Sequence, residues 1–319
     1  MKKILILGGT GFVGSHLCEK LAQQGFHVTI ATRRRSHAVH LQLLPLLDII
    51  ETARLDSVSL TRLLAGHDAV VNLVAILHGT EASFDAVHVQ LPTTLAGACN
   101  ESGVRRLVHI SALGAANDSA SMYQRSKARG EAVLHAAGLD LTVLRPSVIF
   151  GAGDKFLNTF ANLQQIFPVV PLASSEARFQ PVWVEDVASA IVACLLQPQT
   201  AGKVYELAGP EVFSLKQLVE MAGRFAGINR GRGRTVLGLP AALGRLQARI
   251  MELAPGEPMM SRDNLAAMQK DNIATGQLPG LAELGIASPA TVASIAPTYL
   301  GARGLRSGLM ALRKTAGRF

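Results

Sequence analysis

Three spaced glycines near the start of the chain constrain its fold more than any other feature. Residues 3–7 form an apolar run without alternation, which predicts a strand buried on both faces of a parallel sheet. The glycines follow directly, at Gly8, Gly11 and Gly14. Apolar residues then recur at helical spacing, at Val13, Leu17 and Leu21. The glycines therefore lie between a strand and a helix.

Each glycine has a physical task in such a turn. Gly8 permits a tight turn, Gly11 lets the backbone approach a pyrophosphate, and Gly14 lets the helix pack close to the strand. The N–H groups and the positive dipole end of the helix then favour an anion. An ordinary turn is the alternative for glycines alone, but strand, glycines and helix together indicate a dinucleotide site.

Length and composition indicate a folded protein with a substantial core. The chain has 319 residues, of which 49% are hydrophobic and 17% charged, enough for one large or two modest domains. It contains no run of eighteen apolar residues, and its first residues do not resemble a signal peptide, so we expect a cytoplasmic protein. Cys18, Cys99 and Cys194 are too far apart for a disulfide framework or a zinc site, and we expect buried, reduced thiols and no metal.

The formal net charge of +8 indicates an anionic partner. A dinucleotide, an anionic membrane and a nucleic acid all meet that description. Basic residues gather at 33–35, at 224–234 and at 303–318. Because no zinc-finger or RNA-binding aromatic signature accompanies them, nucleic acid is the least favoured partner.

Strand and helix patterns alternate through the first half of the chain. Further strands are expected at 26–32, 48–52, 69–75, 106–111 and 141–145. Helices are expected after the capping residue Asp56, at 84–102 and at 121–137, and a helix-like stretch broken by Pro45 precedes the third strand. This alternation predicts an α/β fold with a doubly wound parallel sheet.

Two domains are expected. A Rossmann dinucleotide-binding domain occupies residues 1–170, and residues 176–210 return to it. Residues 211–319 form a smaller C-terminal lobe for a substrate or partner, with a basic amphipathic tail. That lobe begins with a helix whose capping box is formed by Ser214 and Gln217.

Tyr123 and Lys127 place a phenol and an amine four residues apart on one predicted helix, so both face the same way. A nearby ammonium lowers the pKa of a tyrosine and makes it useful in proton transfer near neutral pH. A solvent-exposed pair is the alternative for such spacing. Ser111 ends the preceding strand at the same sheet edge as the glycine turn, so a hydroxyl, a phenol and a nicotinamide are expected to converge there.

The glycines, Tyr123 and Lys127 together resemble the atypical extended short-chain dehydrogenases/reductases, which are NAD-dependent epimerase/dehydratase-like proteins. The resemblance covers most of the chain. Four further segments are similar to the bacterial relatives of the nucleotide-binding accessory subunit of mitochondrial complex I: Asn72–Ala75, Arg145–Gly151, Asp154–Asn158 and Lys270–Ile273.

The resemblance implies bound NADP(H), with Tyr123 and Lys127 at the catalytic positions and Lys127 also reaching the nicotinamide ribose; Ser111 is the candidate for the catalytic hydroxyl. It further implies that the cofactor is lined by Val74, Ala75, Pro146 and Val148. The glycine turn contributes Gly8, Thr10, Gly11, Phe12, Val13 and Gly14.

The chain departs from that pattern at three positions. Only Ser111 follows the fifth strand, where relatives carry two or three hydroxyl residues, so Ser111 falls one or two residues short of the catalytic position. His88 stands in place of a structural asparagine; a histidine can relay protons, but more often it is a polar packing residue. Ala53 replaces an acidic adenine contact, which leaves Asp56 as a helix cap.

The end of the second strand predicts NADP(H) in preference to NAD(H). About 20 residues past the glycine turn, an NAD site carries a carboxylate for the ribose hydroxyls. This chain has Thr32, Arg33 and Arg34 there. An arginine can bind a 2′-phosphate with two parallel hydrogen bonds. NAD(H) remains the alternative, with Arg33 and Arg34 merely solvated.

Two functions follow from these patterns. One is an NADP(H)-dependent oxidoreductase or epimerase-like enzyme acting on a small molecule through Tyr123 and Lys127. The other is a non-catalytic subunit or assembly protein of a membrane-associated complex, respiratory or quinone-related, which holds its dinucleotide permanently. Intact Tyr123 and Lys127 favour the enzyme, whereas the single Ser111 and His88 favour the subunit.

The C-terminal tail predicts docking on an anionic membrane surface or a membrane-embedded partner, on the inner face of a membrane. Leu305, Leu309 and Leu312 form an apolar stripe flanked by Arg306 and Arg313. A second apolar face lies upstream, in residues 239–253, which contain Leu243, Leu246, Ile250, Arg245 and Arg249. The alternative is that both stripes pack on the protein's own lobe.

Overall fold

The computed structural model describes residues 2–253, 258 and 260–301, which divide into two compact units. The first comprises residues 1–147, 184–208 and 274–288, and the second the remainder. These boundaries differ from the expected ones, because residues 148–170 belong to the second unit and 274–288 to the first. Glu206 explains the second difference, since its carboxylate accepts hydrogen bonds from the N–H and the hydroxyl of Thr275.

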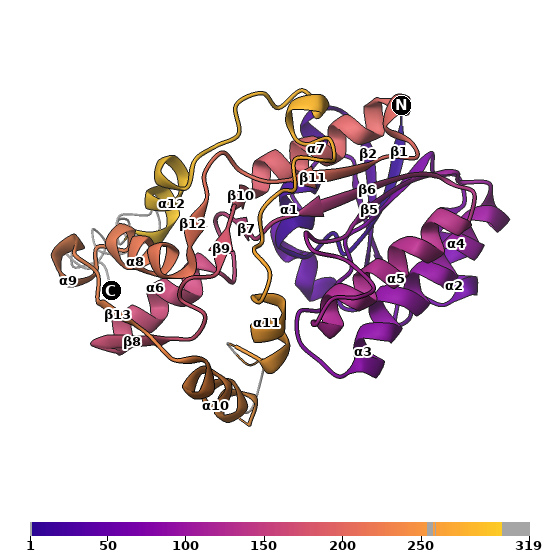
Figure 1. Cartoon of the computed structure of the whole chain (residues 1–319). Helices are drawn as coiled ribbons and strands as arrows, with labels where there is room; N and C mark the ends of the chain where they lie inside the picture. Colours follow the sequence, from indigo (N-terminus) through magenta and orange to yellow (C-terminus); the bar gives the residue numbers. More distant parts are fainter. Residues whose placement is uncertain (1, 254–257, 259, 302–319) are drawn as a thin grey trace, which may run out of the picture. The chain divides into compact units, whose positions relative to one another are not determined.

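The first unit is built on a seven-stranded sheet in the order β11-β6-β5-β4-β1-β2-β3. Figure 1 labels its strands β1, β2, β5, β6 and β11. Every neighbouring pair in the sheet is parallel. The strands are β1 (Lys3–Leu7), β2 (His27–Thr32), β3 (Leu47–Glu51), β4 (Ala69–Asn72), β5 (Arg106–Ile110), β6 (Asp140–Pro146) and β11 (Val204–Leu207). The α/β fold with a doubly wound parallel sheet is thereby confirmed.

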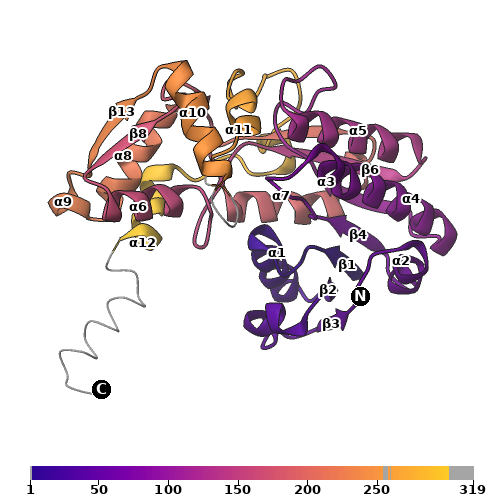
Figure 2. The same ribbon diagram turned by 90° about the horizontal axis from the view of Figure 1, so that it is seen from below.

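Helices cover both faces of this sheet, with α1 and α7 on one face and α2, α4 and α5 on the other (Figure 2). Their bounds are α1 (Phe12–Gln23), α2 (Ser57–Leu64), α3 (Glu81–Asp85), α4 (Leu91–Ser102), α5 (Met122–Ala136) and α7 (Val184–Leu196). Short turns of other types are η1 (Arg35–Leu41), η2 (Ala86–Gln90), η3 (Pro198–Thr200) and η4 (Ala282–Leu284).

Local side chains set several of these boundaries. Asp56 caps α2 by accepting a hydrogen bond from the N–H of Ser59, as the sequence predicts. The helix-like stretch before β3 is only the 3₁₀ helix η1 and turns, because Pro45 lacks an N–H and Leu46 takes a φ of 59°. Strand β4 ends at Asn72 rather than at residue 75, since the Asn72 side chain accepts the N–H of Val74.

The core of the first unit lies between the sheet and its helices, and includes Leu5, Leu7, Leu64, Leu95 and Leu107. All three cysteines are buried free thiols, as predicted, and burial raises the pKa of each to about 12. Among the described residues, no cluster of metal-binding side chains occurs. No helix in the described ranges is long and apolar enough to cross a membrane.

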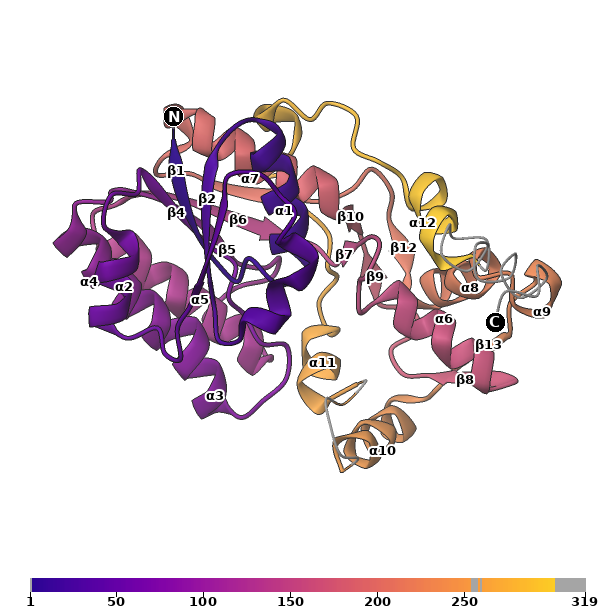
Figure 3. The ribbon, with the colours of Figure 1, turned by 180° about the vertical axis from the view of Figure 1, so that it is seen from behind.

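In its described residues, the second unit is built from short strands and helices (Figure 3). The helices are α6 (Leu157–Ile166), α8 (Leu215–Phe225), α9 (Ile228–Gly231), α10 (Ala241–Glu252), α11 (Arg262–Ala267) and α12 (Val292–Leu300). The strands are β7 (Ile149–Phe150), β8 (Val169–Leu172), β9 (Arg178–Phe179), β10 (Val182–Trp183), β12 (Phe213–Ser214) and β13 (Thr235–Gly238). Its core is formed by α6, α8 and α12, and the predicted capping box of Ser214 and Gln217 starts α8.

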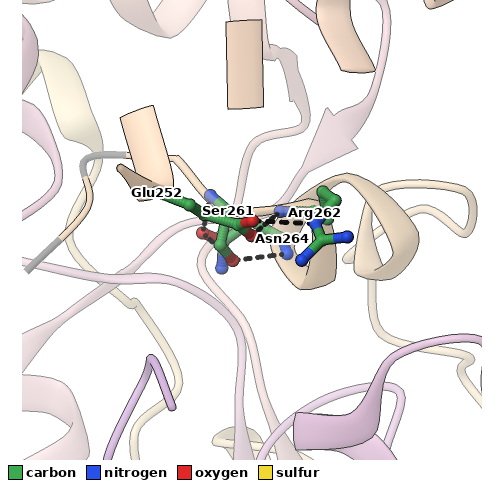
Figure 4. Close-up of polar contacts among 4 residues, drawn as sticks. All are labelled: Glu252, Ser261, Arg262 and Asn264. Atoms are coloured by element: carbon green, nitrogen blue, oxygen red, sulfur yellow. Dashed lines mark hydrogen bonds and ion pairs between the residues drawn. The ribbon is translucent and has the colours of Figure 1, made fainter. Parts of the chain in front are cut away.

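Polar contacts join the end of α10 to the start of α11 (Figure 4). Glu252 accepts hydrogen bonds from the backbone N–H and the guanidinium of Arg262, each at 2.7 Å. Ser261 caps α11, and the side chain of Asn264 accepts the N–H of Ser261 in return. These contacts tie the last residue of α10 to the first turn of α11.

Candidate dinucleotide site

The glycine turn has the geometry of a phosphate-binding loop. Gly8 has a φ of 86°, and its carbonyl accepts the N–H of Gly11 at 3.0 Å. Helix α1 begins at Phe12, and because its N-cap Gly11 has no side chain, the first N–H groups remain available to an anion. A Cβ on Gly14 would collide with the carbonyl oxygen of Gly8, so the turn requires glycine there. These residues fit a dinucleotide pyrophosphate.

Arg33 and Arg34 lie beside this turn. Leu7 pairs with Ala31, so the carboxyl ends of β1 and β2 are adjacent. Both arginines are exposed, and the carbonyl oxygen of Arg34 accepts the hydroxyl of Thr32 at 3.0 Å. Glu51, at the end of the next strand, accepts the backbone N–H of Arg35. The end of β2 itself therefore presents two cations and no carboxylate.

The segment after β4 borders the turn on its other side. The backbone of Leu73 and the N–H of Val74 lie 3.2–3.3 Å from the position of a Cβ on Gly8. The N–H of Val74 is bound by Asn72, and the N–H of Ile76 is accepted by Nε2 of His88, each at 3.2 Å. Val74 and Ala75 are therefore held against the glycine turn.

Lys127 and Ser111 meet at the end of β5. The Lys127 ammonium donates to the carbonyl oxygen of Ile110 at 2.6 Å, one residue before Ser111, and its side chain is almost wholly buried. Burial lowers the pKa of Lys127 to about 8. Within the described part of the chain, the buried Ser111 hydroxyl has no hydrogen-bond partner. Such a hydroxyl is costly unless a ligand satisfies it.

The pKa of Tyr123 is raised, whereas the sequence predicted that it would be lowered. Its ring packs edge-on against Phe84 and His88, with centroid distances of 6.0 and 5.4 Å. Burial raises the pKa of Tyr123 to about 12, so the predicted lowering by Lys127 is wrong for this structure. The physical reason is that desolvation of the phenolate outweighs an ammonium that is itself bonded to Ile110.

Two expected cofactor residues lie at or beyond the end of β6. The carbonyl oxygen of Pro146 accepts the N–H of Leu113, which links β6 to the segment after Ser111. Val148 belongs to the second unit, where its N–H donates to Asn272 at 3.1 Å. The first unit thus contains the glycine turn, Val74, Ala75, Pro146, Ser111, Tyr123 and Lys127, and the second unit contains Val148.

The hydrogen bonds of Asn72 and His88 were not predicted from the sequence. Asn72 also contacts Nδ1 of the buried His109 at 3.2 Å, and His88 contacts Ser126 at 2.8 Å. A polar residue inside an apolar strand, such as His109, is the signal that a buried partner exists. The sequence does not predict which residue that partner is.

A cavity in the first unit lies away from these residues. It measures about 660 Å³ and is lined by residues at the amino ends of the strands, among them Lys3, Leu47, Arg62 and His67. Ligands of open parallel sheets bind at the carboxyl ends instead. The geometry of the glycine turn and of Lys127 is therefore the better guide to the site.

A doubly wound sheet, a glycine turn on its first strand and a Tyr-x-x-x-Lys helix after its fifth define a dinucleotide-binding protein of the short-chain dehydrogenase/reductase class. Residues 4–208 match the NAD dependent epimerase/dehydratase family, and the chain belongs to that family.

Known proteins similar to this chain include a subunit of a mitochondrial NADH dehydrogenase and a reductase. A mouse protein named NADH dehydrogenase (ubiquinone) 1 alpha subcomplex subunit 9, mitochondrial, is 32% identical over 290 residues, covering 88% of this chain and 75% of the mouse protein. A ceramide reductase of Caulobacter vibrioides is 31% identical over 61% of each chain. The dTDP-glucose 4,6-dehydratase DesIV of Streptomyces venezuelae, solved with NAD and TYD bound, superimposes with a TM-score of 0.73 at 21% identity, covering 95% of this chain and 97% of DesIV.

Proposed function

We propose that the protein is a nucleotide-binding subunit or assembly protein of a membrane-associated respiratory or quinone-related complex, and that it holds NADP(H). The observation that carries the nucleotide part is the pair of exposed arginines beside Gly8 at the end of β2. The relation to a subunit of a mitochondrial NADH dehydrogenase supports the second part.

Each part of the bound nucleotide has a candidate partner in the first unit. The N-terminus of α1 would hold the pyrophosphate, and Arg33 and Arg34 would bind the 2′-phosphate. Lys127 is mostly protonated at neutral pH, so its ammonium can donate to the hydroxyls of the nicotinamide ribose. Ser111 offers a buried hydroxyl near the same place.

Nucleotide titration tests the proposal. Wild type is expected to bind NADPH at least tenfold more tightly than NADH, a ratio that corresponds to about 1.4 kcal/mol. Arg33→Ala should lose most of that preference, because it removes a cation that would bind the 2′-phosphate. Arg62→Ala, an exposed arginine on α2, serves as the matched control and should keep the preference. Tighter binding of NADH by wild type, or an unchanged preference in Arg33→Ala, would contradict the proposal.

Helix α10 supports attachment to a membrane or a membrane-embedded partner. Its small residues Gly244 and Ala248 face inward, whereas Leu243, Leu246 and Ile250 are 51%, 54% and 61% exposed. Arg245 and Arg249 lie on the same helix, and each basic residue near an anionic surface contributes roughly 1 kcal/mol. The basic tail, with its stripe at Leu305, Leu309 and Leu312, lies outside the described residues.

Co-sedimentation with anionic and neutral vesicles tests this attachment. Full-length protein is expected to sediment with anionic vesicles, and both the variant Leu243→Ser/Leu246→Ser and a chain ending at Tyr299 should sediment less. Equal recovery of all three proteins would exclude both segments as anchors. Binding that survives high salt would indicate apolar insertion rather than charge.

An NADP(H)-dependent reductase is the second candidate function. It is favoured by the bond of the Lys127 ammonium to Ile110, next to Ser111, by Tyr123 one turn earlier on the same helix, and by the relation to a ceramide reductase. When bound, NADPH supplies a hydride at its nicotinamide. The raised pKa of Tyr123 keeps its phenol protonated at neutral pH, so that it can donate a proton to a carbonyl oxygen.

Cofactor turnover with a panel of carbonyl and quinone compounds distinguishes the two functions. If turnover is found, Tyr123→Phe should abolish it while NADPH binding persists, and Lys127→Ala should impair both. Full activity of Tyr123→Phe would exclude the tyrosine mechanism. Tight NADPH binding without turnover across the panel favours the subunit.

A further inference from the structure

His88 lies where two short helices join. It occupies the π-helical turn η2 between α3 and α4, and only 2% of its surface is exposed. π-helical turns are rare and are often found at functional sites. The ring stacks on Phe84 at a centroid distance of 5.6 Å and meets Tyr123 edge-on. Its orientation is therefore fixed by packing before any hydrogen bond is considered.

The hydrogen-bond network assigns one tautomer to this ring. A backbone N–H can only donate, so Nε2, which accepts from Ile76, carries no proton. Nδ1 lies 2.8 Å from the hydroxyl oxygen of Ser126, and that hydroxyl donates its own hydrogen to the carbonyl oxygen of Tyr123 at 2.7 Å. Ser126 must therefore accept from Nδ1. His88 is neutral, with its proton on Nδ1 and both nitrogens occupied.

The groups around the ring maintain this neutral state. Tyr123 and Lys127 face the ring from α5, and His109 on β5 interacts with it electrostatically. Asp85 on α3, the nearest carboxylate along the chain, is paired with Arg129 at 2.6 Å. Burial and the Lys127 ammonium lower the pKa of His88 to about 3.

The two partners of His88 belong to the two halves of the candidate site. Ile76 lies in the segment 73–77, which borders the glycine turn and contains Val74 and Ala75. Ser126 lies on α5 between Tyr123 and Lys127. Helix α5 also packs directly on the backbone of η2, because a Cβ on Gly130 would collide with the carbonyl oxygen of His88.

We propose that His88 is a positioning residue that fixes the segment 73–77 against helix α5. The affinity for the dinucleotide then depends on the two hydrogen bonds of its ring, and the ring transfers no proton. The proposal rests on the dinucleotide site described above. It assigns to His88 a task for which the ring must remain neutral, and it excludes His88 as a proton relay.

NADPH titration of a small set of variants tests the coupling. His88→Leu removes both hydrogen bonds and should weaken NADPH binding roughly tenfold. His88→Gln keeps an acceptor for the N–H of Ile76 and should lose only about threefold, as should Ser126→Ala. Adding Ser126→Ala to His88→Gln should cause no further loss, because both changes break the same link. His135→Gln, which alters an exposed histidine on α5, is the control.

A ring-nitrogen NMR spectrum supplies a readout that packing alone would not change. The signal of His88 is identified in the wild-type spectrum as the one that disappears in His88→Gln. It should show a protonated Nδ1 and an unprotonated Nε2, and its position should not change between pH 5 and pH 8. A protonated Nε2, titration within that range, or full NADPH affinity in His88→Leu would overturn the proposal. If wild type binds neither NADPH nor NADH, the proposed function fails, and the ring spectrum still decides the state of His88.

Discussion

The two units of this protein use buried polar groups differently. In the first unit, Ser111 and Lys127 lie at the carboxyl end of a strand, and the hydroxyl of Ser111 has no partner among the described residues. In the second unit, the buried Asp154 accepts hydrogen bonds from the N–H groups of Gly151, Phe156 and Asn158 and from the hydroxyl of Tyr299. The hydroxyl of Ser111 thus remains available to a ligand of the proposed site, whereas Asp154 joins segments of the chain.

The units also differ in how their strands are made. Each strand of the seven-stranded sheet has four to seven residues, and all but β11 contain an apolar run that can be recognised locally. Strand β11, with the sequence VYEL, was not expected, because Glu206 interrupts its apolar residues. The second unit has strands of two to four residues, and its pairs, such as β8 with β13, join distant parts of the chain. We therefore expect point substitutions to act through ligand geometry in the first unit and through segment assembly in the second.

The largest effect is expected at Gly14, which tests whether substitutions in the first unit act through the geometry of the ligand site. Gly14→Ala places a Cβ against the carbonyl oxygen of Gly8 and should destabilise the fold by roughly 3 kcal/mol while abolishing nucleotide binding. Gly97→Ala is the matched control, because a Cβ there meets open space on α4, and it should stabilise by about 0.5 kcal/mol. Urea unfolding and NADPH titration measure both. Unimpaired NADPH binding in Gly14→Ala would contradict the turn geometry.

Asp154 tests whether substitutions in the second unit act by separating segments of the chain. Asp154→Ala leaves three backbone N–H groups and the Tyr299 hydroxyl without their acceptor, and should cost roughly 3 kcal/mol of unfolding free energy. Tyr299→Phe removes one of these bonds and should cost about 1 kcal/mol. NADPH affinity should change in neither variant. A loss of stability no greater in Asp154→Ala than in Tyr299→Phe would show that the backbone contacts contribute little.

Acid should weaken the first unit through His88. Its folded pKa of about 3 lies below the unfolded value near 6.5, so the unfolded chain takes up the proton first as pH falls. Stability is therefore complete above pH 6.5 and is lost as pH falls toward 3, by roughly 2 kcal/mol at pH 5. Urea unfolding at pH 7 and pH 5 should show a smaller loss in His88→Gln than in wild type. An equal loss in the two proteins would place the acid sensitivity elsewhere.

The smallest effect is expected on the outer face of α10, where the second unit exposes apolar residues. Leu246→Ser should change the unfolding free energy by less than about 0.5 kcal/mol, since the side chain is already half exposed. Ala248→Leu, on the buried face of the same helix, should cost about 1–3 kcal/mol by overpacking. A large loss in Leu246→Ser would mean that the leucine is packed in the folded protein.

The sequence alone determined the elements whose signals are local. The parallel sheet followed from apolar runs that alternate with helical periods, and the glycine turn followed from backbone sterics at Gly8 and Gly14. Asp56 and Ser214 marked the starts of their helices because a cap acts within three residues. In each case the residues that interact are neighbours in the chain.

Only the tertiary structure decided the contacts between distant residues and the effects of burial. Nothing near Glu206 in the sequence shows that it binds Thr275 and brings residues 274–288 into the first unit. The spacing of Tyr123 and Lys127 predicted the wrong sign for the tyrosine pKa, because desolvation depends on what the fold packs around a ring. His88 was visible as an unusual residue, but its neutral tautomer follows from Ile76 and Ser126, which the chain brings to it only when folded.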